Sequence, residues 1–205
     1  MEKVNNTIKI HAQIVTFLVI WGAILLISKT YTTVSLWSAI KQIPQAISVY
    51  AIIGIIFTKW LWRWSLLYGW LIKIPYLQGT WEGELKSDWA NPETGKRIDP
   101  IPMILVIRQT FSNIKCTLMT KESTSYSTTA DINIIPGGED LFLTYNYTNR
   151  PKAIVRHRSE IHDGASILKI IKKPEMCLEG EYWTSRKTIG DITLKFKSKD
   201  LLEKF

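Results

Sequence analysis

The chain has 205 residues, of which 46% are hydrophobic, and a formal net charge of +8. This length leaves room for one ordinary domain and a short additional segment, so it excludes an enzyme with two large domains. A charge of this size would suggest nucleic-acid binding if the basic residues lay on the globular part. They do not, because residues 1–75 carry seven basic residues and one acidic residue, whereas residues 76–205 carry nineteen and seventeen. We therefore expect no DNA or RNA partner.

Residues 10–28 are predicted to form a transmembrane helix. The run between Lys9 and Lys29 contains few polar side chains. A helix of this length, at about 1.5 Å per residue, spans about 30 Å, the thickness of a hydrocarbon core. A cleaved signal peptide is the alternative, with a basic start at Lys3 and Lys9. Its apolar core would be unusually long, and no small-residue cleavage site follows Ile27.

A second transmembrane helix is predicted over residues 42–62. The apolar run between Lys41 and Lys59 is shorter, but the following segment KWLWRWSLLYGWLIKIP extends it with an amphipathic pattern. Clustered Trp and basic residues of this kind mark the boundary between a bilayer and water. Pro44 suits the first turn of this helix. We expect residues 1–75 to form a membrane region that includes an interfacial linker.

The basic residues near the helix ends predict the orientation of the membrane region. They are Lys3 and Lys9 before the first helix, Lys29 and Lys41 between the helices, and Lys59, Arg63 and Lys73 after the second. Because basic flanks remain cytoplasmic, the N-terminus and the C-terminal domain are both predicted inside, in a bacterial inner membrane. Two cysteines without a disulfide spacing pattern agree with a reducing compartment.

Residues 76–205 are predicted to form an all-β domain. From Gly79 onward, apolar and polar residues alternate with a period of two, and turn signals recur about every ten residues. We expect about eight strands, one of them over residues 153–160. They suit a closed antiparallel up-and-down barrel of the lipocalin-like type, because closure removes exposed strand edges. Such a barrel is filled by side chains or holds one small ligand.

The sequence contains no pattern that indicates catalysis, a metal site or a cofactor. His11 lies in a predicted membrane helix, and His157 and His162 match no metal-ligand spacing, so we expect the last two on the surface or in loops. We find no glycine-rich phosphate loop, no GxSxG motif and no pair of carboxylates beside a base. We therefore expect a protein that is not an enzyme.

Several polar side chains fall on positions whose alternation predicts an inward direction. They are Tyr145 and Tyr147, Thr184 and Arg186, and Arg108, which shares a face with Ile104 and Val106. An Arg at the rim of a barrel, beside Tyr and Thr hydroxyls, can bind an anionic and aromatic small molecule by bidentate contacts and stacking. Alternatively, these residues close the barrel by hydrogen bonding to one another or to strand ends.

Two segments, LQGTWEGELKSDW at 77–89 and GEYWTSRKTIGDITLKF at 180–196, carry a resemblance to a known family. Together with the order of the elements, they resemble the two-transmembrane, β-strand-rich effectors of bacterial CBASS antiphage operons. The resemblance covers nearly the whole chain. It implies that the barrel senses a cyclic dinucleotide made by a nucleotidyltransferase encoded nearby. It also implies self-association, damage to the lipid bilayer by clustered helices, and death of the infected cell.

The ligand-binding candidates combine the resemblance with the alternation pattern. The matching segments contribute Trp81, Ser87, Tyr182, Thr184, Arg186 and Lys187, and the pattern adds Arg108, Tyr145 and Tyr147. The alternative function is a membrane-tethered, lipocalin-like barrel that binds a lipid or another hydrophobic ligand. The GxWxG pattern at residues 79–83 also occurs in lipocalin-like barrels, and so it does not separate the two functions.

Overall fold

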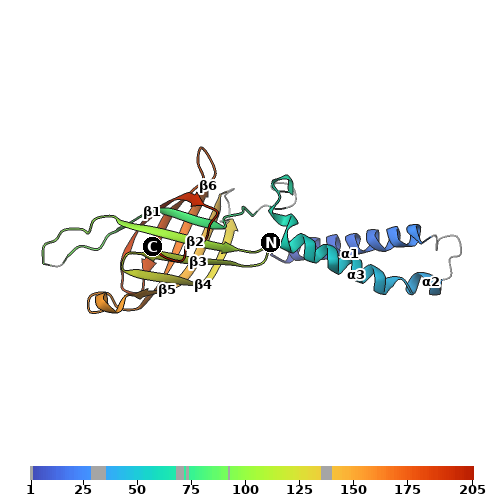
Figure 1. Ribbon diagram of the computed structural model, residues 1–205, viewed down its shortest axis with the longest axis horizontal. Coiled ribbons are helices and arrows are strands. Elements are labelled where there is room, and N and C mark those ends of the chain that lie inside the picture. Colours follow the sequence, from blue (N-terminus) through green and yellow to red (C-terminus); the bar gives the residue numbers. More distant parts are fainter. Residues whose placement is uncertain (1, 29–35, 68–71, 73, 92, 135–139) are drawn as a thin grey trace. The chain divides into compact units, whose positions relative to one another are not determined.

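The computed structural model describes residues 2–28, 36–67, 72, 74–91, 93–134 and 140–205 (Figure 1). The chain divides into two compact units, residues 1–67 and residues 68–205. The first unit is helical and the second is a β-barrel.

The first unit consists of three α-helices followed by two short 3-10 segments. These elements are α1 (Glu2–Ile27), α2 (Leu36–Ile40), α3 (Ile43–Lys59), η2 (Leu61–Arg63) and η3 (Ser65–Leu67). Pro44 lies in the first turn of α3, where its missing N–H breaks no helical hydrogen bond. The rings of Phe17 and Tyr50 meet edge to face with centroids 6.2 Å apart. This contact packs α1 against α3.

Within the described residues, one helical stretch, Trp37–Arg63, is long and apolar enough to cross a membrane. The apolar part of α1 runs only from Gln13 to Ile27. The structure therefore confirms helices at both predicted positions, but it does not confirm two transmembrane spans. Large apolar side chains of both helices, such as Leu18 and Ile53, are exposed. Helices with apolar residues all around are typical of a lipid environment.

The second unit is a closed barrel of eight strands, each antiparallel to the next in sequence order. The strands are β1 (Gly79–Ser87), β2 (Ile101–Gln109), β3 (Ile114–Thr120), β4 (Ser123–Ile134), β5 (Leu141–Pro151), β6 (His162–Ile171), β7 (Cys177–Thr184) and β8 (Ile189–Ser198). This architecture confirms the predicted eight-stranded up-and-down barrel.

The strand predicted over residues 153–160 is wrong. Residues Ala153–Val155 form the 3-10 segment η4, and the amide of Val155 donates to the carbonyl of Lys152 at 3.0 Å. Turns follow as far as His162, where β6 begins. Only three consecutive residues here are apolar, and Val155 alone of them is buried. The segment has no continuous apolar face to place on the barrel interior.

The barrel interior is filled by apolar side chains. Leu143, Leu168, Leu178 and Leu194 are fully buried there, and Cys116 is buried among them. Burial raises the pKa of the Cys116 thiol to about 12, which makes it an unreactive packing group at neutral pH. Among the residues that the structure describes, the barrel interior is therefore a packed core.

A second, smaller apolar cluster lies on the outer face of β2 and β3. Ile104, Val106 and Met119 are buried there beneath Leu201 and Leu202 of the C-terminal segment. The Thr80 hydroxyl donates to the carbonyl of Asp200 and accepts from the amide of Leu202 at 3.2 Å. Consequently, β2 is buried on both faces.

The two ends of the barrel differ in the chain segments that close them. At the end where the chain enters β1, which we call the tether end, the Gln109 amide nitrogen donates to the carbonyl of Pro75 at 3.0 Å. Its oxygen accepts from the amide of Leu77 at 2.6 Å. We call the opposite end the mouth. The β1–β2 connection and η4 both lie at the mouth (Figure 1).

Candidate ligand-binding site at the barrel mouth

Polar and aromatic side chains from three strands and one turn meet at the mouth. Tyr147 lies on β5, His162 begins β6, and Tyr182 lies near the end of β7. All three are less than 10% exposed. Arg186 belongs to the turn between β7 and β8 and is exposed. The positively charged side chain of Arg186 therefore lies at the rim, above the buried rings of these three residues.

Two glycines on neighbouring strands fix the positions of the tyrosine rings. Tyr147 pairs with Gly164 on β6, and Tyr182 pairs with Gly190 on β8. A Cβ atom at Gly164 would lie 2.5 Å from Cζ of Tyr147, and one at Gly190 would lie 2.7 Å from Cε1 of Tyr182. Each ring therefore occupies the space that a side chain would take, as in other aromatic–glycine pairs across strands.

The turn between β7 and β8 is held by Thr184. Its hydroxyl accepts from the amides of Arg186 at 3.3 Å and Thr188 at 3.4 Å, and it lies 2.7 Å from the Thr188 hydroxyl. Lys187 adopts the left-handed conformation, with φ of 62°. These contacts position Arg186, which lies between Thr184 and Thr188 in the sequence, at the rim.

The charge of Arg186 affects the pKa values of the buried tyrosines at the mouth. Burial raises the pKa of Tyr147 and of Tyr182, and the nearby Arg186 guanidinium partly opposes this rise. Its Nη1 donates to the Ser159 hydroxyl at 3.2 Å. A guanidinium has five N–H donors, so most of its capacity is available to an anion.

His162 is neutral and has a defined tautomer. Its Nδ1 lies 2.8 Å from the carbonyl oxygen of Glu160, which can only accept, so Nδ1 carries the proton. Burial lowers the pKa of the imidazole, and Arg186 also contributes to the decrease. The second ring nitrogen, Nε2, is therefore a hydrogen-bond acceptor. Within the described ranges, no three His, Cys, Asp or Glu side chains are grouped as a metal site requires.

One step deeper in the barrel, two buried hydroxyls lack partners of normal geometry. Tyr145 and Ser166 pair across β5 and β6, and both hydroxyl oxygens are buried without a hydrogen bond. The rings of Tyr145 and Tyr147 have centroids 5.9 Å apart. Buried polar groups in native proteins are usually satisfied by protein, water or ligand. The two hydroxyls are nevertheless close enough to interact, and the contact with Ser166 partly opposes the rise that burial causes in the pKa of Tyr145.

Comparison with known proteins assigns the family. Residues 72–196 match the family described as Cap15, cyclic dinucleotide receptor domain. The chain is 32% identical over 195 residues to CD-NTase-associated protein 15 of Staphylococcus schleiferi, covering 95% of this chain and 97% of the relative. It is 30% identical over 200 residues to the protein of the same name from Yersinia aleksiciae, covering 94% and 90%. The chain belongs to the CD-NTase-associated protein 15 family.

Membership of the CD-NTase-associated protein 15 family confirms the resemblance to CBASS effectors. It also supports a cyclic dinucleotide as the ligand and a functional link to a CD-NTase. The matched residues 72–196 include all the mouth residues described above, from Tyr147 on β5 to Arg186 in the β7–β8 turn.

The structure brings together five of the nine residues that the sequence analysis selected as ligand-binding candidates. Ser87, Tyr147, Tyr182, Thr184 and Arg186 all lie at the mouth. Ser87 ends β1 beside Tyr182, and its hydroxyl accepts from the amide of Trp89 at 3.2 Å.

The other four candidates are not part of this cluster. Trp81 is fully buried toward the tether end, where its Nε1 donates to the carbonyl of Leu77 at 3.0 Å. Tyr145 is buried one step below the mouth, and Lys187 is exposed in the β7–β8 turn.

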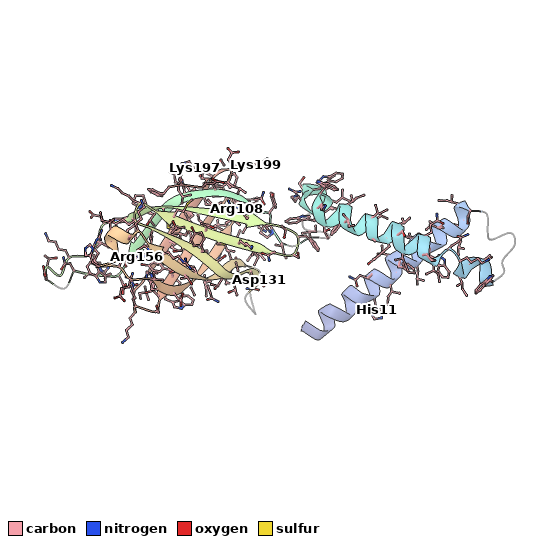
Figure 2. All side chains as sticks on the ribbon, turned by 60° about the horizontal axis from the view of Figure 1, so that its bottom comes forward. His11, Arg108, Asp131, Arg156, Lys197 and Lys199 are labelled. Atoms are coloured by element: carbon pink, nitrogen blue, oxygen red, sulfur yellow. The ribbon has the colours of Figure 1, made fainter. Side chains whose placement is uncertain are left out.

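The inward direction expected for Arg108 is wrong. Arg108 is exposed, whereas Ile107 and Gln109 on either side of it are buried (Figure 2). Ile104 and Val106 do share its face, but that face is the outer one, and the C-terminal segment covers its apolar part.

Sequence reasoning missed two residues of the mouth. His162 was expected on the surface but is only 9% exposed, and Ser159 contacts Arg186. The sequence offers one signal for His162, because it keeps the alternation phase of Ser166, Leu168 and Ile170 on the inner face of β6. No sequence signal identifies Ser159.

Proposed function

We propose that the barrel binds its cyclic dinucleotide at the mouth. The observation that carries this proposal is the convergence of Tyr147, His162, Tyr182 and Arg186 at one end of a domain that matches a cyclic dinucleotide receptor. This site has no catalytic role in the proposal, so the chain acts as a receptor and effector and not as an enzyme.

The chemistry of the mouth suits the parts of a cyclic dinucleotide. Arg186 supplies bidentate, charge-assisted hydrogen bonds to a phosphate. The faces of Tyr147 and Tyr182 offer surfaces on which bases stack. Nε2 of His162 accepts from an N–H group at the edge of a base. Ser87 and Thr184 add hydroxyl groups that both donate and accept.

The helical unit converts binding into an effect on the bilayer. In this proposal both α1 and α3 cross the bacterial inner membrane, with the N-terminus and the barrel in the cytoplasm, as the flanking basic residues predict. Ligand binding favours self-association because the associated state has the higher affinity for the ligand. Clustered helices then disrupt the membrane, and the infected cell dies. The ligand comes from a nucleotidyltransferase encoded nearby.

The alternative, a lipid-binding barrel, receives less support. A lipid held in the lipocalin manner needs an open apolar interior. Here the fully buried side chains of Leu143, Leu168 and Leu178 fill that interior among the described residues. The polar mouth is also a poor match for an acyl chain.

Dye release from vesicles tests the proposed sequence of events. The full chain is reconstituted into phosphatidylethanolamine–phosphatidylglycerol vesicles, and cyclic di-GMP, cyclic di-AMP and cyclic GMP–AMP are added in turn. We expect one of these ligands to release the trapped dye, and its linear dinucleotide to release none. Binding of a cyclic dinucleotide without any dye release would contradict membrane disruption.

A further inference from the structure

A row of buried polar side chains crosses the inner wall of the barrel close to its rim. Ser125 on β4 pairs with Asn149 on β5, and Asn149 pairs with His162 on β6. Their exposed fractions are only 5%, 7% and 9%. Asn149 keeps the alternation phase of Tyr145 and Tyr147, which are also buried, so it lies on the inner face of β5. We call Ser125, Asn149 and His162 the rim row.

The carboxamide of Asn149 is held at one end only. The Ser125 hydroxyl donates to Oδ1 of Asn149 at 2.9 Å, and this hydrogen bond is buried. The amide nitrogen, Nδ2, has no hydrogen-bond partner among the described residues. Polar groups on side chains this deeply buried usually have a partner in the protein, in water or in a ligand. The two N–H donors of Asn149 are therefore available to a group bound at the mouth.

A donor and an acceptor lie side by side in the rim row. Nε2 of His162 is the acceptor, because Nδ1 carries the proton that it donates to the carbonyl of Glu160. Residues that pair directly across antiparallel strands have Cβ atoms about 5 Å apart, so the amide of Asn149 is a close neighbour of this imidazole. Proteins recognise unpaired nucleobases by hydrogen bonds to their edges. Adenine offers N1 as an acceptor beside its N6 amino donor, and guanine offers O6 beside N1–H.

The phosphate-binding candidate lies in line with the rim row. The Ser185 amide donates to the Asp163 carbonyl at 2.8 Å, which continues the pairing of β6 and β7 past the end of β7. Arg186 therefore lies beside His162, in agreement with its effect on the pKa of that imidazole. Neighbouring strands are about 4.8 Å apart, so the backbones at Arg186 and Asn149 are separated by about 10 Å. A nucleotide spans a comparable distance from its phosphate to the far edge of its base.

We propose that Asn149 determines which base of a cyclic dinucleotide the barrel accepts. Its amide donates to the acceptor on the edge of one base, and the adjacent donor of that base bonds to Nε2 of His162. The hydrogen bond from Ser125 to Oδ1 fixes which end of the carboxamide meets the ligand. This inference rests on the proposed function for the position of the phosphate at Arg186, and it adds to that function a residue that reads the base.

The Asn149→Asp variant tests this assignment because it replaces the two donors by acceptors. Beside Nε2 of His162 it presents two acceptors to the ligand. Guanine carries two adjacent donors on its edge, N1–H and the N2 amino group, whereas adenine carries an acceptor beside its one amino donor. We expect the ratio of the affinities for cyclic di-GMP and cyclic di-AMP to move toward cyclic di-GMP by about 10-fold. The added charge repels the phosphates of both ligands and so cancels from this ratio.

Isothermal titration calorimetry of the full chain in detergent measures the affinities at about pH 8, where a histidine of ordinary pKa is neutral. Competition with the tightest of cyclic di-GMP, cyclic di-AMP and cyclic GMP–AMP gives the affinity of a weaker ligand. Asn146→Asp is the matched control, because Asn146 lies on the same strand but is exposed on its outer face. Urea unfolding verifies that each variant is folded. Asn149→Leu removes the amide without adding a charge, and it should weaken binding by roughly 2- to 10-fold.

A ratio that moves toward cyclic di-GMP in Asn149→Asp, and stays unchanged in Asn146→Asp, would support the inference. An unchanged ratio in folded Asn149→Asp would overturn it, because a purely structural role changes both affinities by the same factor. If the buried carboxylate unfolds that variant, folded Asn149→Leu with the affinity of the unmodified chain would overturn it as well. In both cases the unmodified chain still binds ligand, and the proposed function stands. If the folded, unmodified chain binds none of the three ligands, the proposed function fails and this inference fails with it.

Discussion

Removal of the Arg186 guanidinium should weaken ligand binding far more than it weakens the fold. Arg186 is exposed and makes one described side-chain hydrogen bond, to Ser159 at 3.2 Å. Surface substitutions of this kind change the free energy of unfolding by about 0.5 kcal/mol or less. By contrast, a hydrogen bond to a charged group contributes about 1.5–3 kcal/mol. Arg186→Gln should therefore lower the affinity for a cyclic dinucleotide by roughly 10- to 150-fold.

Isothermal titration calorimetry of the full chain in detergent measures this change at a stated ionic strength. Arg186→Lys should give an intermediate loss, because it keeps the charge but not the planar fork that binds phosphate. Lys152→Gln is the matched control, since it removes a positive charge from the exposed loop after β5. Equal affinity of Arg186→Gln and the unmodified chain, with both folded, would refute the placement of the phosphate at Arg186.

Three further predictions concern the construction of the barrel. Gly164→Ala places a methyl group 2.5 Å from Cζ of Tyr147, so it should destabilise the fold by about 1–3 kcal/mol in urea unfolding and weaken ligand binding. Unchanged stability would argue against the close packing of that ring. Burial lowers the pKa of His162 in the folded protein. As the pH falls, His162 of the unfolded protein is therefore protonated first. The free energy of unfolding should decrease as the pH drops below about 6.5, toward the lower pKa of His162 in the folded protein. His162→Gln should flatten that part of the stability profile, and an identical profile would show that other groups cause it. Trp81→Phe leaves the buried carbonyl of Leu77 without its donor and should cost about 1–3 kcal/mol, whereas a loss below about 0.5 kcal/mol would count against that hydrogen bond.

The barrel was predictable from sequence because most of its strands face the core on one side and solvent on the other. In β5, for example, Tyr145 and Tyr147 are buried while Asn146 between them is exposed. Alternation of this kind fixes both the strand and its phase. The eight-stranded architecture follows from these local patterns, because closure is the arrangement that leaves no exposed edge.

Where both faces of a strand are buried, the alternation of apolar and polar residues is lost and does not predict which side chains point inward. β2 packs on the core through Leu105 and Ile107 and beneath the C-terminal segment through Ile104 and Val106. Its sequence therefore carries no period of two, and the direction of Arg108 could not be read from it. The cover comes from residues about one hundred positions away, which a local pattern does not contain.

Most of the mouth was accessible from sequence, whereas the positions of His162 and Ser159 depended on three-dimensional closure. Thr184 and Tyr182 follow the phase of β7, and their place at the mouth follows from that phase. His162 matches no metal-ligand spacing in the sequence, and for that reason it was expected on the surface or in a loop. Only the approach of β7 and its turn buries this residue beside Arg186.

In the proposed function, this barrel is a receptor whose mouth holds a cyclic dinucleotide. Calorimetric titration of the unmodified full chain with cyclic di-GMP, cyclic di-AMP and cyclic GMP–AMP tests it most directly. We expect saturable binding of at least one of them, and we expect Arg186→Gln to weaken this binding by roughly 10- to 150-fold. Absence of binding for all three, with the barrel folded, would contradict it.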